Sequence, residues 1–153
     1  MKNNVKYMIA ATGVFAVSLI VGIMFLNTTV NADEIMVYKS PTCGCCNKWV
    51  KHLESQGFKV KTKNVRNLVP IKDEHGVQRQ FQSCHTAKIG NYFIEGHVPA
   101  KDIKKLLKDK PDIKGLAVPG MPMGSPGMEG PRQDRYDVIA VGNNNEATVF
   151  SSY

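Results

Sequence analysis

The chain has 153 residues and a formal net charge of +7, from 20 basic and 13 acidic residues. This length suits one domain with a single hydrophobic core and excludes a large multidomain enzyme. No stretch combines clustered arginines with interleaved aromatic residues, so the excess of lysines indicates a solvated surface and argues against a protein that binds nucleic acid.

The first 32 residues have the pattern of a secretory signal peptide. Lys2 and Lys6 form a positive region, and an uncharged apolar stretch runs from residue 7 to residue 26. Val30-Asn31-Ala32 then offers small residues for cleavage. The apolar stretch is nearly long enough to span a bilayer, so an uncleaved N-terminal membrane anchor is the alternative. Both alternatives predict a periplasmic or otherwise extracytoplasmic protein in which residues 33–153 form the folded domain.

The folded part begins with a strand, a helix and a second strand. Residues 34–38 have the apolar composition of a short β-strand. The apolar residues that follow recur at the spacing of one helix face: Cys46, Trp49, Val50 and Leu53. Gly57 is placed to end this helix. Lysines alternate with less polar residues from 58 to 65, which is typical of a half-exposed strand.

The middle of the chain is less regular. Residues 78–87 are predicted to form a helix that carries Cys84 and His85. A second amphipathic helix follows Pro99, which suits a first helical position. An extended segment over residues 116–118 comes next.

The last elements indicate the fold. A Gly/Pro-rich loop from 120 to 131 excludes helix and central strand. Segments 136–141 and 147–150 then flank a turn of hairpin composition. This element order predicts an α/β fold of the thioredoxin-like class, with a central mixed sheet, flanking helices and a C-terminal β-hairpin. A cis-proline faces the cysteines in that fold, and Pro119, with Pro122 as the alternative, is the candidate for it.

The segment Thr42-Cys43-Gly44-Cys45-Cys46 holds three of the four cysteines. At a helix N-terminus, free N–H groups and the helix dipole stabilise thiolate. Adjacent cysteines almost never pair with each other, which argues against a purely structural disulfide framework. Two interpretations remain: dithiol exchange between Cys43 and Cys46, or binding of Cu(I), which thiolate and thioether ligands select. Cys45 favours the metal, because an exchange enzyme does not require it.

Two further donors are adjacent to each other and far from this motif. Cys84 would complete a four-sulfur site if the fold brings it to the helix N-terminus, and His85 is a candidate ligand beside it. The alternative is a buried cysteine next to a surface histidine. The role of His97 stays open.

Methionines in the Gly/Pro-rich loop add a third kind of donor. Met121 and Met123 lie where little else is apolar, and a thioether binds Cu(I) without losing a proton. Packing of the loop onto the domain is the alternative, and the role of Met128 stays open. The candidate metal ligands are therefore Cys43, Cys45, Cys46, Cys84, Met121, Met123 and His85.

Four blocks of the sequence, in matching order, resemble the extracytoplasmic copper-resistance proteins often called CopG. These blocks are residues 42–46, 83–87, 95–100 and 116–129. The resemblance implies a thioredoxin-like domain with a multinuclear Cu(I) cluster at its Cys-x-Cys-Cys site and a redox role between Cu(I) and Cu(II). It also implies that the copper-binding thiolates are Cys43, Cys45, Cys46 and Cys84.

The sequence thus predicts an exported Cu(I)-binding protein for copper resistance or homeostasis. Copper ions are its expected ligands, and an exported copper-handling protein or an efflux pump is its candidate protein partner. Cycling between Cu(I) and Cu(II) would make it a copper oxidoreductase, and whether it is an enzyme stays open. The alternative function is a thiol–disulfide oxidoreductase that uses Cys43 and Cys46.

Overall fold

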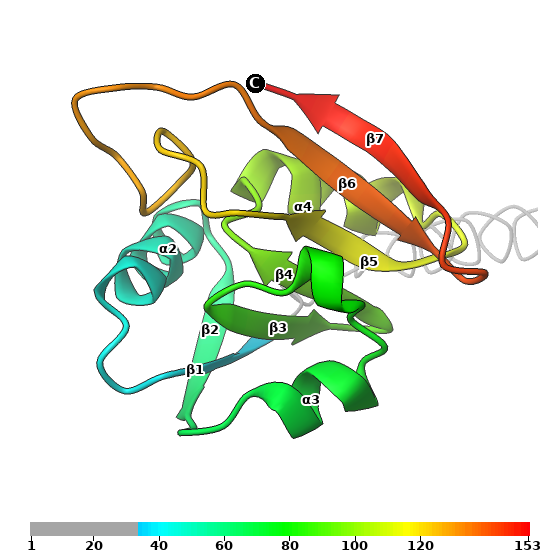
Figure 1. Ribbon diagram of the computed structural model, residues 1–153, viewed down its shortest axis with the longest axis horizontal. Helices are drawn as coiled ribbons and strands as arrows, with labels where there is room; N and C mark the ends of the chain where they lie inside the picture. The colour runs from blue at the N-terminus through cyan, green and yellow to red at the C-terminus, as the bar shows by residue number, and fades with distance from the viewer. Residues whose placement is uncertain (1–33) are drawn as a thin grey trace, which may run out of the picture. The chain divides into compact units, whose positions relative to one another are not determined.

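The structure, a computed structural model, describes residues 34–153 (Figure 1). The strands of this part are β1 (Glu34–Lys39), β2 (Lys59–Asn64), β3 (His85–Ile89), β4 (Tyr92–Gly96), β5 (Ile113–Val118), β6 (Asp137–Gly142) and β7 (Ala147–Ser152). The helices are α2 (Gly44–Ser55), α3 (Val69–Glu74) and α4 (Ala100–Asp109), with a 3-10 helix, η1, at Arg79–Phe81. The predicted signal peptide or anchor, residues 1–32, lies outside the described residues.

One mixed sheet contains these strands in the order β2-β1-β3-β4-β5-β6-β7. β1 pairs parallel to β2 and antiparallel to β3, and β3 pairs antiparallel to β4. This four-strand arrangement is the core of a thioredoxin-like fold. β5 extends it parallel to β4, and the antiparallel hairpin of β6 and β7 completes the sheet. The predicted central mixed sheet, flanking helices and C-terminal β-hairpin are therefore confirmed.

Two of the helices cover one face of the sheet. Trp49 and Leu53 of α2 and Ile103 and Leu106 of α4 are completely buried. They belong to one hydrophobic cluster with side chains from β1, β3, β4, β5 and β6. Burial of apolar side chains is the main favourable term in folding, so this cluster fixes α2 against the sheet. The N-terminus of α2, where the cysteines lie, is thereby fixed as well.

The opposite face of the sheet is covered too. Leu116 and Val118 of β5 join the cluster under α2 and α4, whereas Ala117 between them joins a second cluster with Phe81 and Phe93. Successive side chains of a strand point to opposite faces, so both faces of β5 are buried. A strand buried on both faces lacks the alternation of apolar and polar residues by which an exposed strand is recognised.

The helix predicted over residues 78–87 is wrong. η1 provides a single helical turn at its start, and the backbone at Gln82 is extended, with φ −63° and ψ 138°. His85–Ile89 instead forms β3, which pairs with β1 on one side and β4 on the other. The hydrogen-bond partners of this segment are therefore strands that a local sequence pattern does not reveal.

The cis-proline prediction is wrong as well. No peptide bond in residues 34–153 is cis. Pro119 follows β5, which lies outside the four-strand core, because the chain adds β5 before the final hairpin. The residue that precedes β3 and faces the other cysteines is Cys84.

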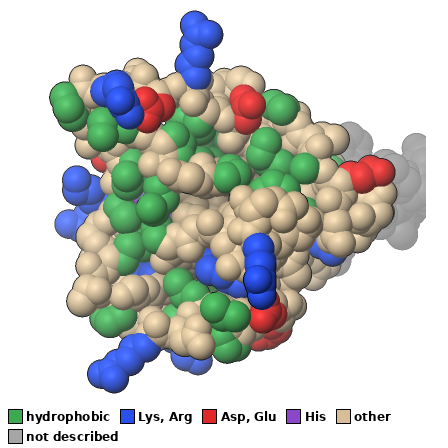
Figure 2. All heavy atoms as spheres, in the orientation of Figure 1, with side chains coloured by type: hydrophobic (Ala, Val, Ile, Leu, Met, Phe, Trp, Pro, Cys, Tyr) green, Lys and Arg blue, Asp and Glu red, His purple; other side chains and the backbone are tan. Residues whose placement is uncertain are grey.

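The positive charge is spread over the surface. The edge strand β2 carries three exposed lysines: Lys59, Lys61 and Lys63. Lysines on an edge strand hinder its pairing with strands of other molecules. On the face seen in Figure 2, basic side chains lie at several separate places and do not form one large patch. Within the described part of the chain, no helix has the length and apolar character needed to cross a membrane.

Gly115 provides a test of the close approach between β4 and β5. A Cβ atom at this position would come within 2.1 Å of the carbonyl oxygen of Phe93. We expect Gly115→Ala to lower the free energy of unfolding by about 2 kcal/mol or more, because the two strands must separate. Gly44→Ala is the matched control, since its added Cβ meets no atom within 4 Å beyond its chain neighbours and its own helix backbone. Urea denaturation compares the variants, and equal effects would contradict the packing described.

Candidate metal centre

The first three cysteines lie where β1 ends and α2 begins. Cys43 is the N-cap of α2, and its Sγ accepts a hydrogen bond from the backbone N–H of Cys46 at 3.3 Å. A sulfur at this position can accept hydrogen bonds from backbone N–H groups that have no partner inside the helix. It also lies at the positive end of the helix dipole. The local structure therefore favours the thiolate form of Cys43 whenever it is reduced.

Pairing between β1 and β3 brings the fourth cysteine to this helix terminus. Lys39, the last residue of β1, is opposite His85, the first residue of β3. Cys84 directly precedes β3, so it lies next to the end of β1 and close to the N-terminus of α2. The Sγ atoms of Cys84 and Cys46 are 3.3 Å apart.

All four sulfurs form one group. Cys43 and Cys46 are joined by a disulfide, with their Cα atoms 5.4 Å apart, and Cys45 and Cys84 are free thiols. Cys45 Sγ lies 3.4 Å from Cys43 Sγ and 3.9 Å from Cys84 Sγ. The four sulfurs lie within 4.8 Å of one another. After reduction of the disulfide, they would offer four thiolates to one small volume.

Two imidazoles lie against Cys84. His85 Nδ1 and His97 Nε2 are each 3.4 Å from its Sγ. His97 Nδ1 lies 2.7 Å from the carbonyl oxygen of Pro126, which can only accept, so Nδ1 carries the proton. The lone pair of His97 Nε2 then faces the sulfur. His85 Nε2 is buried without a hydrogen-bond partner in the structure.

Burial keeps these donors neutral in the metal-free protein. It lowers the pKa of His85 well below its ordinary value, and the nearby His97 and Lys72 add to the effect. It also lowers the pKa of His97, although the Pro126 carbonyl opposes the shift. Burial raises the pKa of the Cys84 thiol to about 11. A cation bound here would therefore meet neutral imidazoles and would displace the proton of Cys84.

Trp49 covers one side of the imidazole pair. Its ring lies 4.3 Å from the ring of His85, measured between centroids, and its Nε1 donates to the carbonyl oxygen of Val98 at 2.9 Å. The rings of His85 and His97 are 5.2 Å apart. The aromatic packing excludes water from the inner side of the site, which strengthens electrostatic interactions there.

The Gly/Pro-rich loop packs beside this site. A Cβ atom at Gly127 would approach Cys45 O and Trp49 N to 2.8 Å each, so the loop lies directly on the first turn of α2. Met121 is 40% exposed. Met123 Sδ lies against Gly130, where an added Cβ would be 2.7 Å away. The ligand roles of both methionines stay predictions.

Sequence reasoning left the role of His97 open, and the structure places it in contact with Cys84. The contact follows from the antiparallel pairing of β3 and β4, because Thr86 is opposite Glu95 and the same register brings the residue after β4 next to the residue before β3. His52 is not part of this group, since its Nε2 accepts the backbone N–H of Ala100.

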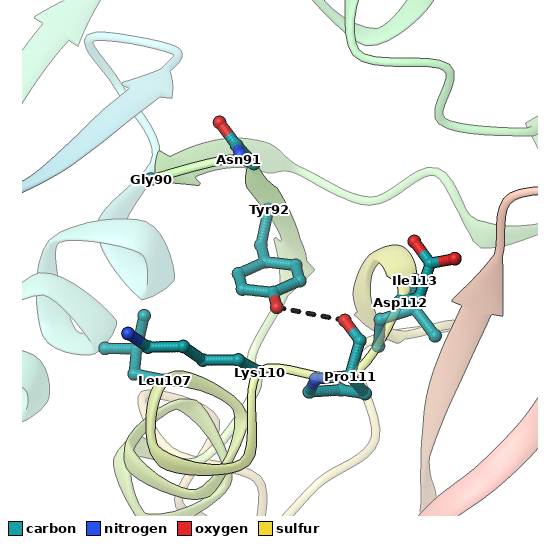
Figure 3. A pocket seen from close by; sticks show the side chains of 8 residues that line it. All are labelled: Gly90, Asn91, Tyr92, Leu107, Lys110, Pro111, Asp112 and Ile113. Atoms are coloured by element: carbon teal, nitrogen blue, oxygen red, sulfur yellow. Dashed lines mark hydrogen bonds between the residues drawn. The ribbon is translucent and has the colours of Figure 1, made fainter.

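A separate hollow of about 530 Å³ lies between the β3–β4 turn and the connection from α4 to β5 (Figure 3). Tyr92 crosses it and donates from its hydroxyl to Pro111 O at 2.9 Å. β3 runs from Cys84 to this turn, so the hollow lies at the far end of the strand. No cysteine or histidine lines it. Among residues 34–153, the groups of cysteines and histidines that could hold a metal ion lie at the N-terminus of α2 and at Cys84 beside it.

The fold and the site together define a thioredoxin-like protein with a cluster of thiol and imidazole donors at the start of its first described helix. Comparisons with known proteins agree with this class. Residues 81–128 match a family model described as "Protein of unknown function, DUF411". No curated protein matches the chain.

Two solved structures of the copper resistance protein CopG are similar to this chain. Form 2 has a TM-score of 0.77 and form 1 a TM-score of 0.76, and both are 46% identical in sequence. Each match covers 80% of this chain and 99% or 98% of the CopG chain. The chain therefore belongs to the CopG family.

Thiol modification tests the arrangement of the sulfurs. In oxidised, metal-free protein, iodoacetamide should label Cys45 and Cys84 and spare Cys43 and Cys46, because a disulfide joins the second pair. Peptide mass mapping reads out the labelled positions, and reduced protein, labelled at all four, is the control. A cross-link between Cys45 and Cys84 would contradict the arrangement.

Proposed function

We propose that this protein binds Cu(I) through a thiolate cluster and thereby protects against copper stress. The observation that carries the proposal is the convergence of four cysteine sulfurs within 4.8 Å. Thiolates are soft donors that select Cu(I), and Zn²⁺ sites of four cysteines usually come as two separated pairs. The relatives named copper resistance protein CopG support copper as the ion.

The number of thiolates favours more than one copper ion. A single Cu(I) among four thiolates would leave a large excess of negative charge in a partly buried site, which is costly. Several Cu(I) ions would nearly cancel that charge. The neutral imidazoles of His85 and His97 can add donors without adding charge, and imidazole suits copper. The assignment therefore extends from the four cysteines to His85 and His97, with Met121 and Met123 as weaker candidates.

The disulfide supports a redox form of this function. Joining Cys43 to Cys46 releases two electrons and two protons from the dithiol, and each Cu(II) takes up one electron. One dithiol can therefore reduce two Cu(II) ions to Cu(I). Cys45 and Cys84 stay reduced in the disulfide form, so they remain available to hold Cu(I). An external reductant of the thiol class would restore the full set.

The proposed location is outside the cytoplasm, in the periplasm or an equivalent compartment. The signal-like pattern of residues 1–32 motivates this location. An exported copper-handling protein or an efflux pump would then deliver or remove the copper.

A thiol–disulfide oxidoreductase is the second candidate function. The Cys43–Cys46 disulfide at a helix N-terminus favours it. The free thiols argue against it, because Cys45 lies 3.4 Å from Cys43 and Cys84 lies 3.3 Å from Cys46. Such neighbours would attack the disulfide in competition with a substrate.

Cys45→Ala separates the two functions. The variant removes a sulfur that metal binding uses and that dithiol exchange does not require. We expect the Cu(I) stoichiometry to fall, while Cys43 and Cys46 still form their disulfide. Metal analysis after anaerobic loading measures the first quantity, and thiol titration before and after oxidation measures the second. Unchanged copper stoichiometry with loss of disulfide reductase activity would favour the oxidoreductase.

Cys84→Ser tests the long-range closure of the site. Copper that binds only the native state adds about 4 kcal/mol of stability at a thousandfold excess over Kd. The Cu(I)-induced rise in melting temperature should be far smaller in Cys84→Ser than in the wild type. The comparison variant replaces the loop thioethers: Met121→Leu, Met123→Leu and Met128→Leu together. The triple variant should keep most of the Cu(I)-induced rise in melting temperature, because a thioether is a weaker, neutral ligand. If the triple variant lost the rise and Cys84→Ser kept it, the loop rather than Cys84 would complete the site.

A further inference from the structure

A buried ion pair lies at the start of β3 and supplies none of the candidate metal ligands. Lys72 of α3 and Glu95 of β4 form a salt bridge, and their side chains are 5% and 0% exposed. Removing two charges from water is expensive, so a buried pair persists only when further hydrogen bonds satisfy it. The partners of Glu95 therefore show what the pair holds in place.

Both carboxylate oxygens of Glu95 have partners. Oε1 accepts the backbone N–H of Ser83 at 2.5 Å and also the Lys72 ammonium. Oε2 accepts the hydroxyl of Thr86 at 2.7 Å, and Lys72 donates to the same hydroxyl at 2.9 Å. Glu95 thus connects the residue before Cys84 with a residue of β3.

This connection matters because Ser83 and Cys84 precede the sheet. β3 begins at His85, and its pairing with β1 and β4 fixes the chain from that residue onward. The hydrogen bond to Glu95 fixes the other side of Cys84, at the Ser83 N–H. Phe81 and Gln82 are also held, by the second hydrophobic cluster and by a hydrogen bond to Val77 O, but the Ser83 N–H is the restraint closest to Cys84 on this side.

We propose that Glu95, oriented by Lys72, is a positioning residue that holds Cys84 against the sulfurs of Cys43, Cys45 and Cys46. The inference deepens the proposed function and rests on it, because it assigns part of the copper affinity to a residue that does not touch the ion. The feature that matters is an acceptor oxygen for Ser83 N–H. The two charges of the pair cancel each other, and the positioning role does not require either of them.

A purely structural pair behaves differently. Replacing a buried ion pair by apolar residues of similar volume is often neutral for stability. A structural role would therefore leave copper binding the same with or without an acceptor at position 95. A positioning role makes copper binding depend on that acceptor. Groups that orient a metal ligand typically contribute 10–100-fold to affinity.

Two double variants, which differ only at position 95, decide between these roles. Lys72→Met with Glu95→Gln removes both charges and keeps an acceptor oxygen for Ser83. Lys72→Met with Glu95→Leu removes both charges and the acceptor. Cu(I) affinity, measured by competition with a chromophoric chelator, should stay within about threefold of wild type in the Gln variant. It should fall about 10–100-fold in the Leu variant.

Two further measurements exclude a general loss of structure. The melting temperatures of the metal-free double variants show whether both remain folded. In reduced, metal-free protein, the rate at which iodoacetamide modifies Cys84 relative to Cys45 should rise in the Leu variant and stay at the wild-type value in the Gln variant. If the Leu variant does not fold, Glu95→Asp replaces it, since Asp keeps the charge but withdraws the oxygen from Ser83. Its Cu(I) affinity should also fall.

If both double variants bound Cu(I) as tightly as the wild type, the positioning role would be overturned. If both lost affinity to the same extent, it would be overturned too, since the charges rather than the acceptor oxygen would then matter. Failure of the proposed function looks different, because the reduced wild-type protein itself would not bind Cu(I). In that case the modification rate of Cys84 alone decides the positioning role.

Discussion

Lys39 and His85 are opposite each other where β1 and β3 pair in antiparallel fashion, and the position of every sulfur follows from that pairing. The end of β1 delivers the three clustered cysteines to the N-terminus of α2, and the start of β3 delivers Cys84 to the same place. Successive residues of a strand face opposite sides, so a shift of one residue would turn Cys84 away. Buried apolar residues of β1 and β3, packed in the cluster under α2 and α4, oppose such a shift.

The two sides of the sulfur cluster have different environments. Cys43 lies at a helix terminus that stabilises negative charge. Cys84 lies among buried, neutral imidazoles, where burial raises the pKa of its thiol. Donors therefore change across a few ångströms from thiolates at a helix terminus to a thiol with two imidazoles. Sulfur donors select Cu(I) and nitrogen donors suit Cu(II), so this change of donors fits the redox function proposed above.

The sequence contained enough local information to predict the first elements. The apolar spacing from Cys46 to Leu53 predicts α2, and the turn composition before Ala147 predicts the hairpin. β3 was mistaken for a helix because its hydrogen-bond partners are distant strands, which a local sequence pattern does not reveal. Pro119 was assigned to the wrong loop because β5 extends the sheet beyond the four-strand core.

The site was predictable to a similar degree. Three cysteines within four consecutive positions drew attention to Cys43, Cys45 and Cys46. The histidine next to Cys84 singled out that residue. The roles of Lys72 and Glu95 were not visible, since two isolated charges in a sequence say nothing about burial or pairing. His97 became relevant only because the antiparallel pairing of β3 and β4, in which Thr86 is opposite Glu95, places it beside Cys84.

Trp49 is the single tryptophan of the chain, and its ring packs against His85 at the edge of the sulfur cluster. Indole emission responds to the groups in contact with the ring, and no second indole obscures the signal. The indole emission of the unlabelled protein, excited selectively over the tyrosines, therefore reports on this site. Occupancy, thiol oxidation and displacement of His85 can be followed in real time, in dilute solution and without an attached dye.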